Sequence, residues 1–133
     1  MATIFTKIIN GDIPCYKIAE DDNFFAFLDI NPNAVGHTLC VPKKEVDKLL
    51  DLDEVTYAGL MAFSRKVGRG IEAAIPCERV GMMVIGLEVP HVHVHLIPLH
   101  SMQNATFQHK VHMDQEAFET TAKKIRDRLK HSF

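Results

Sequence analysis

The chain has no tryptophan, no excess of charge of one sign and no long apolar run. Its 133 residues include 15 Lys and Arg against 17 Asp and Glu, a formal net charge of −2. So small an imbalance argues against general binding to nucleic acid. No apolar stretch approaches the length of a membrane span, and the N-terminus lacks the basic and then apolar pattern of a signal peptide. We therefore expect neither a nucleic-acid partner nor a membrane partner.

Cysteine is also scarce. The three cysteines, Cys15, Cys40 and Cys77, are odd in number and far apart, so they form neither a Cys-x-x-Cys pair nor a disulfide framework. Free thiols are typical of a reducing compartment, and we expect a cytoplasmic protein. Hydrophobic residues make up 47% of the chain, and no repeat or low-complexity linker interrupts it. Residues 1–133 should therefore form one domain with a real core.

The spacing of apolar residues predicts short strands in the first third of the chain. A helical turn at 4–9 ends at Asn10-Gly11, and strands follow at 15–20, 24–30 and 37–41. The first two of these strands should form a hairpin, because turn-forming residues lie between them.

The pattern becomes helical from residue 43, with Asp53 as a candidate N-cap and Pro76 after the helix end. The apolar stripe of this long helix comprises Leu60, Phe63, Val67, Ile71 and Ala74. A fourth strand at 80–85 is apolar on both faces. We expect both faces to be covered, one of them by a partner subunit.

A last helix is predicted at about 114–130, with Asp114 as its N-cap. Its apolar face comprises Phe118, Thr121, Ile125 and Leu129. The polar stretch before it, which contains His100, His109 and His112, reads as a loop without an assigned role. The whole pattern predicts an α+β domain with an antiparallel sheet of about five strands, one long central helix and a C-terminal helix.

Three histidines alternate with aliphatic residues in the stretch Pro90-His91-Val92-His93-Val94-His95-Leu96-Ile97-Pro98. Alternate residues of a strand share a face, so the imidazoles would form a row about 13 Å long, with the aliphatic residues buried on the opposite face. Such alternation is ordinary in a half-exposed strand. Solvent exposure alone is a poor explanation for three alternating histidines, because they would repel one another when charged. A functional site is the better interpretation of the row.

Two kinds of chemistry fit the row. A His-x-His pair on a strand can present two nitrogen ligands to zinc or another transition metal, with His37 or Glu88 as a further ligand, but the spacing does not complete a ligand set. Alternatively, a neutral imidazole can attack phosphorus while its neighbours hold the phosphate oxygens and protonate the leaving group. The row by itself leaves both open.

The row resembles the signature of the histidine triad (HIT) family, His-φ-His-φ-His-φ-φ with φ apolar, which residues 91–97 match at every position. Further blocks resemble the family in the family's order. They are Ile4-Phe5-Thr6-Lys7-Ile8-Ile9, Gly11-Asp12-Ile13-Pro14, Glu20-Asp21-Asp22, Ala26-Phe27-Leu28-Asp29-Ile30-Asn31-Pro32, Gly36-His37-Thr38-Leu39 and Val41-Pro42-Lys43-Lys44. Together they extend over most of the chain and make the resemblance specific.

The resemblance implies a nucleotide-binding hydrolase or transferase that needs no cofactor. Its substrates would be purine nucleoside phosphoramidates, which release AMP or a similar nucleotide, or dinucleoside polyphosphates. The enzyme would attack the α-phosphate of either substrate and form a covalent nucleotidyl-histidine. By its place in the motif, His93 would be the nucleophile, flanked by His91 and His95, and His37 would match a further active-site histidine. The resemblance also implies a homodimer.

Eight positions match the wall of the family's base and sugar pocket. They are Ile4, Phe5, Ile8, Phe27, Leu28, Asp29, Ile30 and Leu39. The apolar ones could equally be ordinary core residues. Asp29 is different, because an acid between two apolar residues needs a partner, and the two hydroxyls of a ribose would provide one. A turn role before Asn31-Pro32 is the competing explanation.

The chain departs from the resemblance in two places. Thr3, Thr6 and Glu45 stand where some members carry zinc ligands, so we expect no bound metal. The connection before the row, residues 85–90, is short and contains Glu88 where other members place polar donors near the phosphate. A carboxylate beside a phosphate is unfavourable. A nucleotide-binding module with weak or no catalysis, acting through partners, is therefore the alternative, and a metal-binding protein is a third interpretation.

Overall fold

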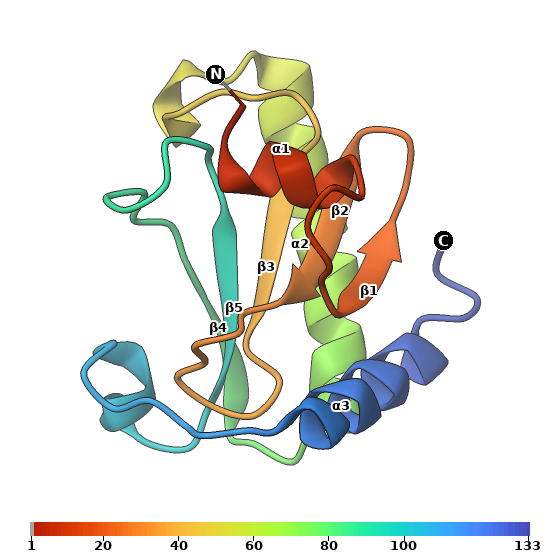
Figure 1. Cartoon of the computed structure of the whole chain (residues 1–133), viewed down its shortest axis with the longest axis vertical. Helices are drawn as coiled ribbons and strands as arrows, with labels where there is room; N and C mark the ends of the chain where they lie inside the picture. The colour runs from red at the N-terminus through yellow and green to blue at the C-terminus, as the bar shows by residue number, and fades with distance from the viewer. Residues whose placement is uncertain (1) are drawn as a thin grey trace.

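The computed structural model of the chain describes residues 2–133, and its centre is a five-stranded antiparallel sheet (Figure 1). The strands are β1 (Lys17–Glu20), β2 (Phe24–Leu28), β3 (Thr38–Pro42), β4 (Arg79–Met83) and β5 (Val94–Leu99), in the spatial order β1-β2-β3-β5-β4. The helices are α1 (Ile4–Ile9), α2 (Glu54–Ala74) and α3 (Gln115–Arg128), with 3₁₀ turns at Leu49–Asp51 and Met102–Ala105. The predicted α+β class and architecture are confirmed. No helix within residues 2–133 is long and apolar enough to cross a membrane.

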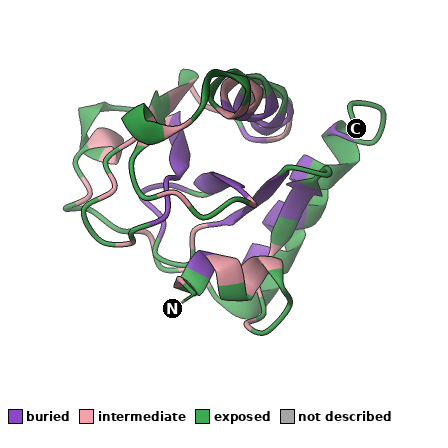
Figure 2. Ribbon diagram, turned by 90° about the horizontal axis from the view of Figure 1, so that it is seen from above, coloured by how far each residue is buried: buried purple, intermediate pink, exposed green. Residues whose placement is uncertain are grey.

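The two faces of the sheet have different covers, because β2 alternates its side chains between them. Phe24, Ala26 and Leu28 lie in the main core with α2 and α3. Phe25 and Phe27 lie in a smaller cluster with Phe5 of α1. Figure 2 shows α2 and α1 on opposite sides of the sheet. The strand β5, which carries His95 of the row, therefore has a core face and a face on the side of the sheet where α1 lies.

The long helices begin and pack as their sequences predict. The Asp53 side chain accepts a hydrogen bond from Thr56 N at 3.1 Å, and that of Asp114 accepts one from Ala117 N at 2.8 Å. The predicted stripe residues of α2 are buried except for the half-buried Ala74, and those of α3 are all buried. The helical pattern from residue 43 was extended too far, because α2 begins only at Glu54.

The histidine row is not one continuous strand, contrary to the prediction. The pairing of β5 with β3 begins at Val94, opposite Cys40. Before it, His91 N donates to Val89 O and Val92 N donates to Val46 O, each at 2.8 Å. The ladder ends here because β3 ends at Pro42, which has no N–H to offer. Residues 91–93 therefore lie outside the ladder, although Val92 still packs in the main core with Val94, and the row histidines have different hydrogen-bond partners.

The outer strand β4 is shorter than predicted and is an edge strand. It ends at Met83 rather than at residue 85. Within the single chain it is not covered on both faces, since the side chain of Met82 is 48% exposed. The predicted cover by a second subunit stays a prediction.

The packing of α3 gives a first testable expectation. Ile125 is fully buried against the main core. Ile125→Ala should lower the free energy of unfolding by about 2–5 kcal/mol, because it removes buried methyl groups and leaves a cavity. Urea unfolding of this variant and of Lys124→Ala, its exposed neighbour on α3, provides the measurement and its control. Equal stabilities for the two variants would contradict the packing of α3 onto the domain.

Candidate active site

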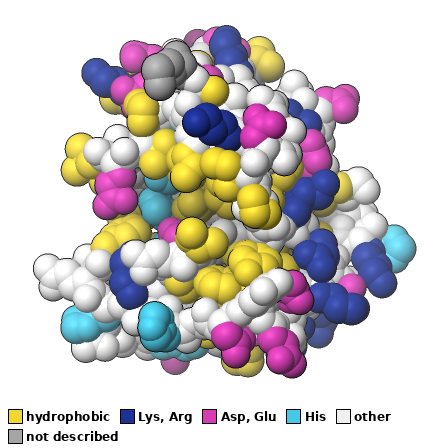
Figure 3. All heavy atoms as spheres, in the orientation of Figure 1, with side chains coloured by type: hydrophobic (Ala, Val, Ile, Leu, Met, Phe, Trp, Pro, Cys, Tyr) yellow, Lys and Arg dark blue, Asp and Glu magenta, His cyan; other side chains and the backbone are white. Residues whose placement is uncertain are grey.

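A cavity of about 420 Å³ opens where four segments meet. It is lined by Asp29 and Asn31 after β2, by residues 85–88 after β4, by His93 and His95 of the row, and by Phe107 and Lys110 after β5. Figure 3 shows histidine side chains recessed among hydrophobic ones on this face. Two of the three row histidines therefore reach the cavity from its floor.

His91 is the row histidine that does not line the cavity. It is fully buried, and both of its ring nitrogens are occupied. Nε2 donates to the carbonyl of Pro42 and Nδ1 accepts from the hydroxyl of Thr3, each at 2.8 Å. Burial lowers the pKa of His91, and the Pro42 hydrogen bond only partly opposes this. The ring is therefore a neutral link between the end of β3 and the N-terminus of α1.

Thr3, Thr6 and Glu45 come together at this link. Glu45 Oε1 accepts hydrogen bonds from Thr3 N at 2.8 Å and from Thr6 Oγ1 at 2.7 Å. These hydrogen bonds, the one from Thr3 N foremost, lower the pKa of Glu45. Thr3, Thr6 and Glu45 thus form a hydrogen-bonded cluster of two hydroxyls and a carboxylate around His91. None of these three side chains is a thiol. The expectation of no bound metal at this place stays a prediction.

His93 presents one free nitrogen to the cavity. Its Nδ1 lies 2.8 Å from the carbonyl of His91, so Nδ1 must carry the proton that makes this hydrogen bond. In a neutral ring, Nε2 then holds a lone pair, and it has no hydrogen-bond partner within residues 2–133. Phe5 packs edge-on against the ring at 4.9 Å between centroids. The backbone hydrogen bond fixes the tautomer of this ring, and Phe5 of α1 helps to fix its orientation.

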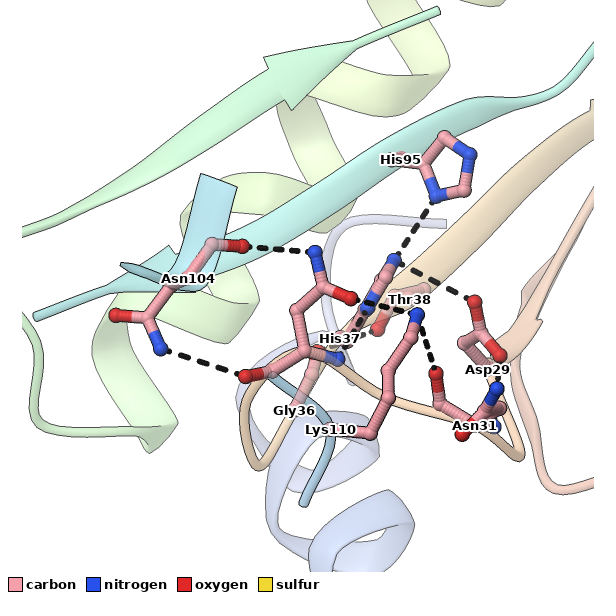
Figure 4. Close-up of polar contacts among 9 residues, drawn as sticks. Asp29, Asn31, Gly36, His37, Thr38, His95, Asn104 and Lys110 are labelled. Carbon is pink, nitrogen blue, oxygen red and sulfur yellow. Dashed lines mark hydrogen bonds and ion pairs between the residues drawn. The ribbon is translucent and has the colours of Figure 1, made fainter. Parts of the chain in front are cut away.

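A chain of hydrogen bonds fixes His37 and His95 in the same way (Figure 4). Asn33 N donates to His37 Nδ1 at 2.9 Å, so the proton of the neutral His37 ring lies on Nε2. His37 Nε2 in turn donates to His95 Nδ1 at 2.9 Å. The proton of His95 therefore lies on Nε2, which offers an N–H donor at the cavity.

Both rings of this chain are neutral at ordinary pH. Burial, reinforced by the charges of neighbouring groups, lowers the pKa of His37 to about 3 and that of His95 to about 4. The cavity floor thus offers a nitrogen of His93 without a partner beside an N–H of His95, and the His95 ring is neutral. A nitrogen lone pair next to a neutral N–H donor is an arrangement that suits chemistry at a phosphorus atom.

Asp29 has the turn role that its sequence context predicted as one alternative, and the ribose role stays a prediction. Its Oδ1 accepts from Asn31 N at 2.8 Å, which closes the turn after β2. Its Oδ2 lies 3.5 Å from Nε2 of His37 and at the cavity wall. Burial raises the pKa of Asp29. One carboxylate oxygen therefore holds the turn, and the other remains available to a ligand.

Asp29, His37 and His95 also form the one group within residues 2–133 that could hold a metal ion, with ligand atoms within 4.8 Å of one another. The His37 and His95 nitrogens are only 2.9 Å apart and share a proton. Two nitrogens bound to one tetrahedral zinc lie about 3.3 Å apart and cannot keep that proton. The geometry fits a hydrogen-bonded chain better than a metal centre.

The apolar residues predicted to line the base and sugar pocket do not all come together. Phe5, Phe27 and Leu39 share one cluster, and Ile8 packs against it. The Leu28 side chain lies on the opposite face of the sheet, in the main core. The side chains of Ile4 and Ile30 are 49% and 74% exposed. Four of the predicted apolar residues therefore lie together, with Phe5 in contact with His93, and Leu28 cannot contribute its side chain to them.

The sequence prediction missed three residues of the site, Asn33, Phe107 and Lys110. Asn33 is buried and holds His37 through its backbone N–H. Phe107, whose φ of 61° is in the left-handed region, lies edge-on to His95 at 5.0 Å between centroids. Lys110 lines the cavity. A lone aromatic residue and a lysine within a polar stretch were the only sequence signals for the last two.

A family model described as "HIT domain" matches residues 10–102. The chain belongs to the histidine triad family. A HIT-like protein of Borreliella burgdorferi is 34% identical over 131 residues, which are 92% of this chain and 94% of that protein. An adenosine 5'-monophosphoramidase of Schizosaccharomyces pombe is 39% identical over 100 residues, 74% of each chain.

Solved structures of the histidine triad family agree with this assignment. A HIT-like protein of Bartonella henselae has a TM-score of 0.84 at 33% identity and covers 96% of both chains. A zinc-bound histidine triad family protein of Mycobacterium smegmatis has a TM-score of 0.84 at 27% identity and covers 99% of this chain and 96% of its own. The match to the family model ends at residue 102, so Phe107 and Lys110 lie beyond it.

The neutral histidines predict how stability depends on pH. Unfolded histidines titrate near 6.5, whereas His37 and His95 titrate near 3 and 4 in the fold. As the pH falls below about 6.5 the unfolded chain takes up protons that the folded chain does not, so the folded state loses about 1.4 kcal/mol per pH unit for each such group. Urea unfolding between pH 6.5 and 5 should show this loss.

The variant His95→Asn tests the source of that pH dependence. The Asn Oδ1 atom can still accept from His37 Nε2, so the chain keeps its acceptor while one titrating group disappears. The slope of unfolding free energy against pH should become shallower than in the parent. His100→Asn, a change at an exposed histidine, should keep the parental slope. A parental stability that does not change over this range would contradict the neutral chain.

Proposed function

We propose that the protein hydrolyses nucleoside 5'-phosphoramidates, or transfers their nucleotidyl group, by attack of His93 on the α-phosphorus. The observation that carries the proposal is the hydrogen bond from His93 Nδ1 to the carbonyl of His91, because it leaves the Nε2 lone pair free at the cavity. The Schizosaccharomyces pombe relative named as an adenosine 5'-monophosphoramidase supports this substrate class.

The proposed reaction has two steps. The lone pair of His93 Nε2 forms a bond to the α-phosphorus, the phosphorus–nitrogen bond breaks, and the leaving amine takes up a proton from solvent at the open cavity. Water then attacks the phosphorus, the bond from phosphorus to His93 Nε2 breaks, the nucleotide leaves, and the proton lost by water returns to solvent. His95 donates its Nε2–H to a phosphoryl oxygen in both steps. With a pKa of about 4, His95 acts as this neutral donor rather than as a charged acid.

His91 and His37 would act through other residues in this scheme. His91 holds the carbonyl that orients His93, and His37 holds the tautomer of His95. The apolar wall formed by Phe5, Phe27 and Leu39 would take the base. The preference for purine nucleotides, the homodimer and the cytoplasmic location stay predictions. The exposed outer side of β4 is where a second subunit would pair.

Replacement of the nucleophile gives the central test. His93→Ala should reduce turnover of an AMP–amine substrate by several orders of magnitude while AMP still binds, because the pocket walls remain. Rapid quench with a radiolabelled phosphoramidate, followed by peptide mapping, should place the label on His93 in the parent. Near-parental turnover in His93→Ala, or label on another residue, would refute the assignment. Binding without turnover in the parent would favour a nucleotide-binding module.

Asp29 is proposed to hold the ribose through its free Oδ2 atom. A charge-assisted hydrogen bond contributes about 1.5–3 kcal/mol, so Asp29→Asn should weaken AMP binding by about tenfold or more. The amide oxygen of Asn can still accept from Asn31 N, and the turn after β2 should survive. Calorimetry with AMP and with 2',3'-dideoxy-AMP is the measurement. If the parent binds both nucleotides equally well, the ribose role is wrong.

A further inference from the structure

The proposed phosphate site has an unusual balance of charge. His95 on its floor is neutral at ordinary pH, because burial lowers its pKa to about 4. Two acids, Asp29 and Glu88, also line the cavity. A nucleotide would add further negative charge to this surface, and like charges in a partly buried site are unfavourable. His95 is neutral, and residues 85–88 contain no lysine or arginine that would offset this charge.

Lys110 is the only Lys or Arg among the described residues that line the cavity. Its ammonium nitrogen donates to Asn33 Oδ1 at 2.8 Å and to Asn31 O at 3.1 Å (Figure 4). It lies 4.8 Å from the centre of the Phe107 ring, which itself packs edge-on against His95. An ammonium has three N–H donors, so two fixed contacts leave one for a ligand.

The segment that carries Lys110 is fixed to the site at several points. Asn33 Nδ2 donates to the Asn104 carbonyl at 2.7 Å, and Asn104 Nδ2 donates back to the Asn33 carbonyl at 3.3 Å. Next to Lys110, Val111 N donates to Pro32 O at 2.9 Å. The same turn, residues 31–37, that fixes His37 therefore also holds the backbone of Lys110 beside the cavity.

We propose that Lys110 is a phosphate-binding residue of the site, whose ammonium offsets the carboxylates of Asp29 and Glu88 beside a bound nucleotide. The inference rests on the proposed nucleotide function. It assigns the ammonium to the phosphate of the nucleotide rather than to the base or the ribose. Charge-assisted hydrogen bonds to phosphate are the strong ones, and lysine binds phosphate as a point charge.

The test compares two ligands that differ only in the phosphate. Dissociation constants of AMP and adenosine are measured by calorimetry for the parent, Lys110→Met, Lys110→Arg and Lys124→Met. Methionine keeps an apolar stem against Phe107 and removes the charge. Lys124 is an exposed lysine of α3, outside the cavity lining, so Lys124→Met removes the same charge elsewhere.

Lys110→Met should weaken AMP binding by about tenfold and leave adenosine binding within about twofold of the parent, as expected for the loss of one charge-assisted contact. Lys110→Arg should restore most of the AMP affinity, and Lys124→Met should bind both ligands like the parent. Equal weakening of AMP and adenosine by Lys110→Met would mean that Lys110 only braces Asn31 and Asn33, and would overturn the proposal. Unchanged AMP binding would overturn it as well.

Turnover of an AMP–amine substrate separates this inference from the proposed function. If the parent is an active hydrolase and Lys110→Met binds AMP normally, the role of Lys110 is wrong while the function stands. If the parent shows no turnover but Lys110→Met loses AMP affinity selectively, the phosphate site is correct and the hydrolase proposal is wrong. Urea unfolding of Lys110→Met confirms that the binding data refer to folded protein.

Discussion

The site depends on the burial of neutral imidazoles whose protons are placed by backbone groups. The amide of Asn33 and the carbonyl of His91 are the two ends of this arrangement. The amide of Asn33 forces the His37 proton onto Nε2, and that proton then determines the tautomer of His95. The carbonyl of His91 forces the His93 proton onto Nδ1. A lone pair and a donor consequently lie side by side on neighbouring rings, 4.9 Å apart between centroids.

Burial is what keeps His37, His91 and His95 uncharged. A buried cation is costly, so the pKa of each of these three rings is lowered. The same burial removes positive charge from a place where a phosphate would bind. The site must therefore obtain its positive charge from outside the row. The segment after β5 brings Lys110 to the wall, where it lies beside Phe107 and the turn that holds His37.

The break in the histidine row follows from a proline. Pro42 ends β3, and its carbonyl accepts from the His91 ring instead of from a strand amide. His91 leaves the sheet, becomes buried and links β3 to α1 through Thr3. Phe5 of α1 then packs against both His91 and His93. The three histidines consequently have three different roles in the structure: a buried link, a ring with a free lone pair and a donor.

Local patterns in the sequence determined much of the fold. The period of the apolar residues and the capping acids Asp53 and Asp114 predicted α2 and α3, and the run of histidines with its flanking blocks identified the family and the row. Such features depend on neighbours a few residues apart, so a single sequence contains them. Tertiary structure alone decided the contacts between distant segments, such as Asn33 with Asn104 or Lys110 with Asn31. The sequence also could not show that Pro42 would capture the His91 ring, because that hydrogen bond joins residues far apart in the chain, and only the packed sheet brings them together.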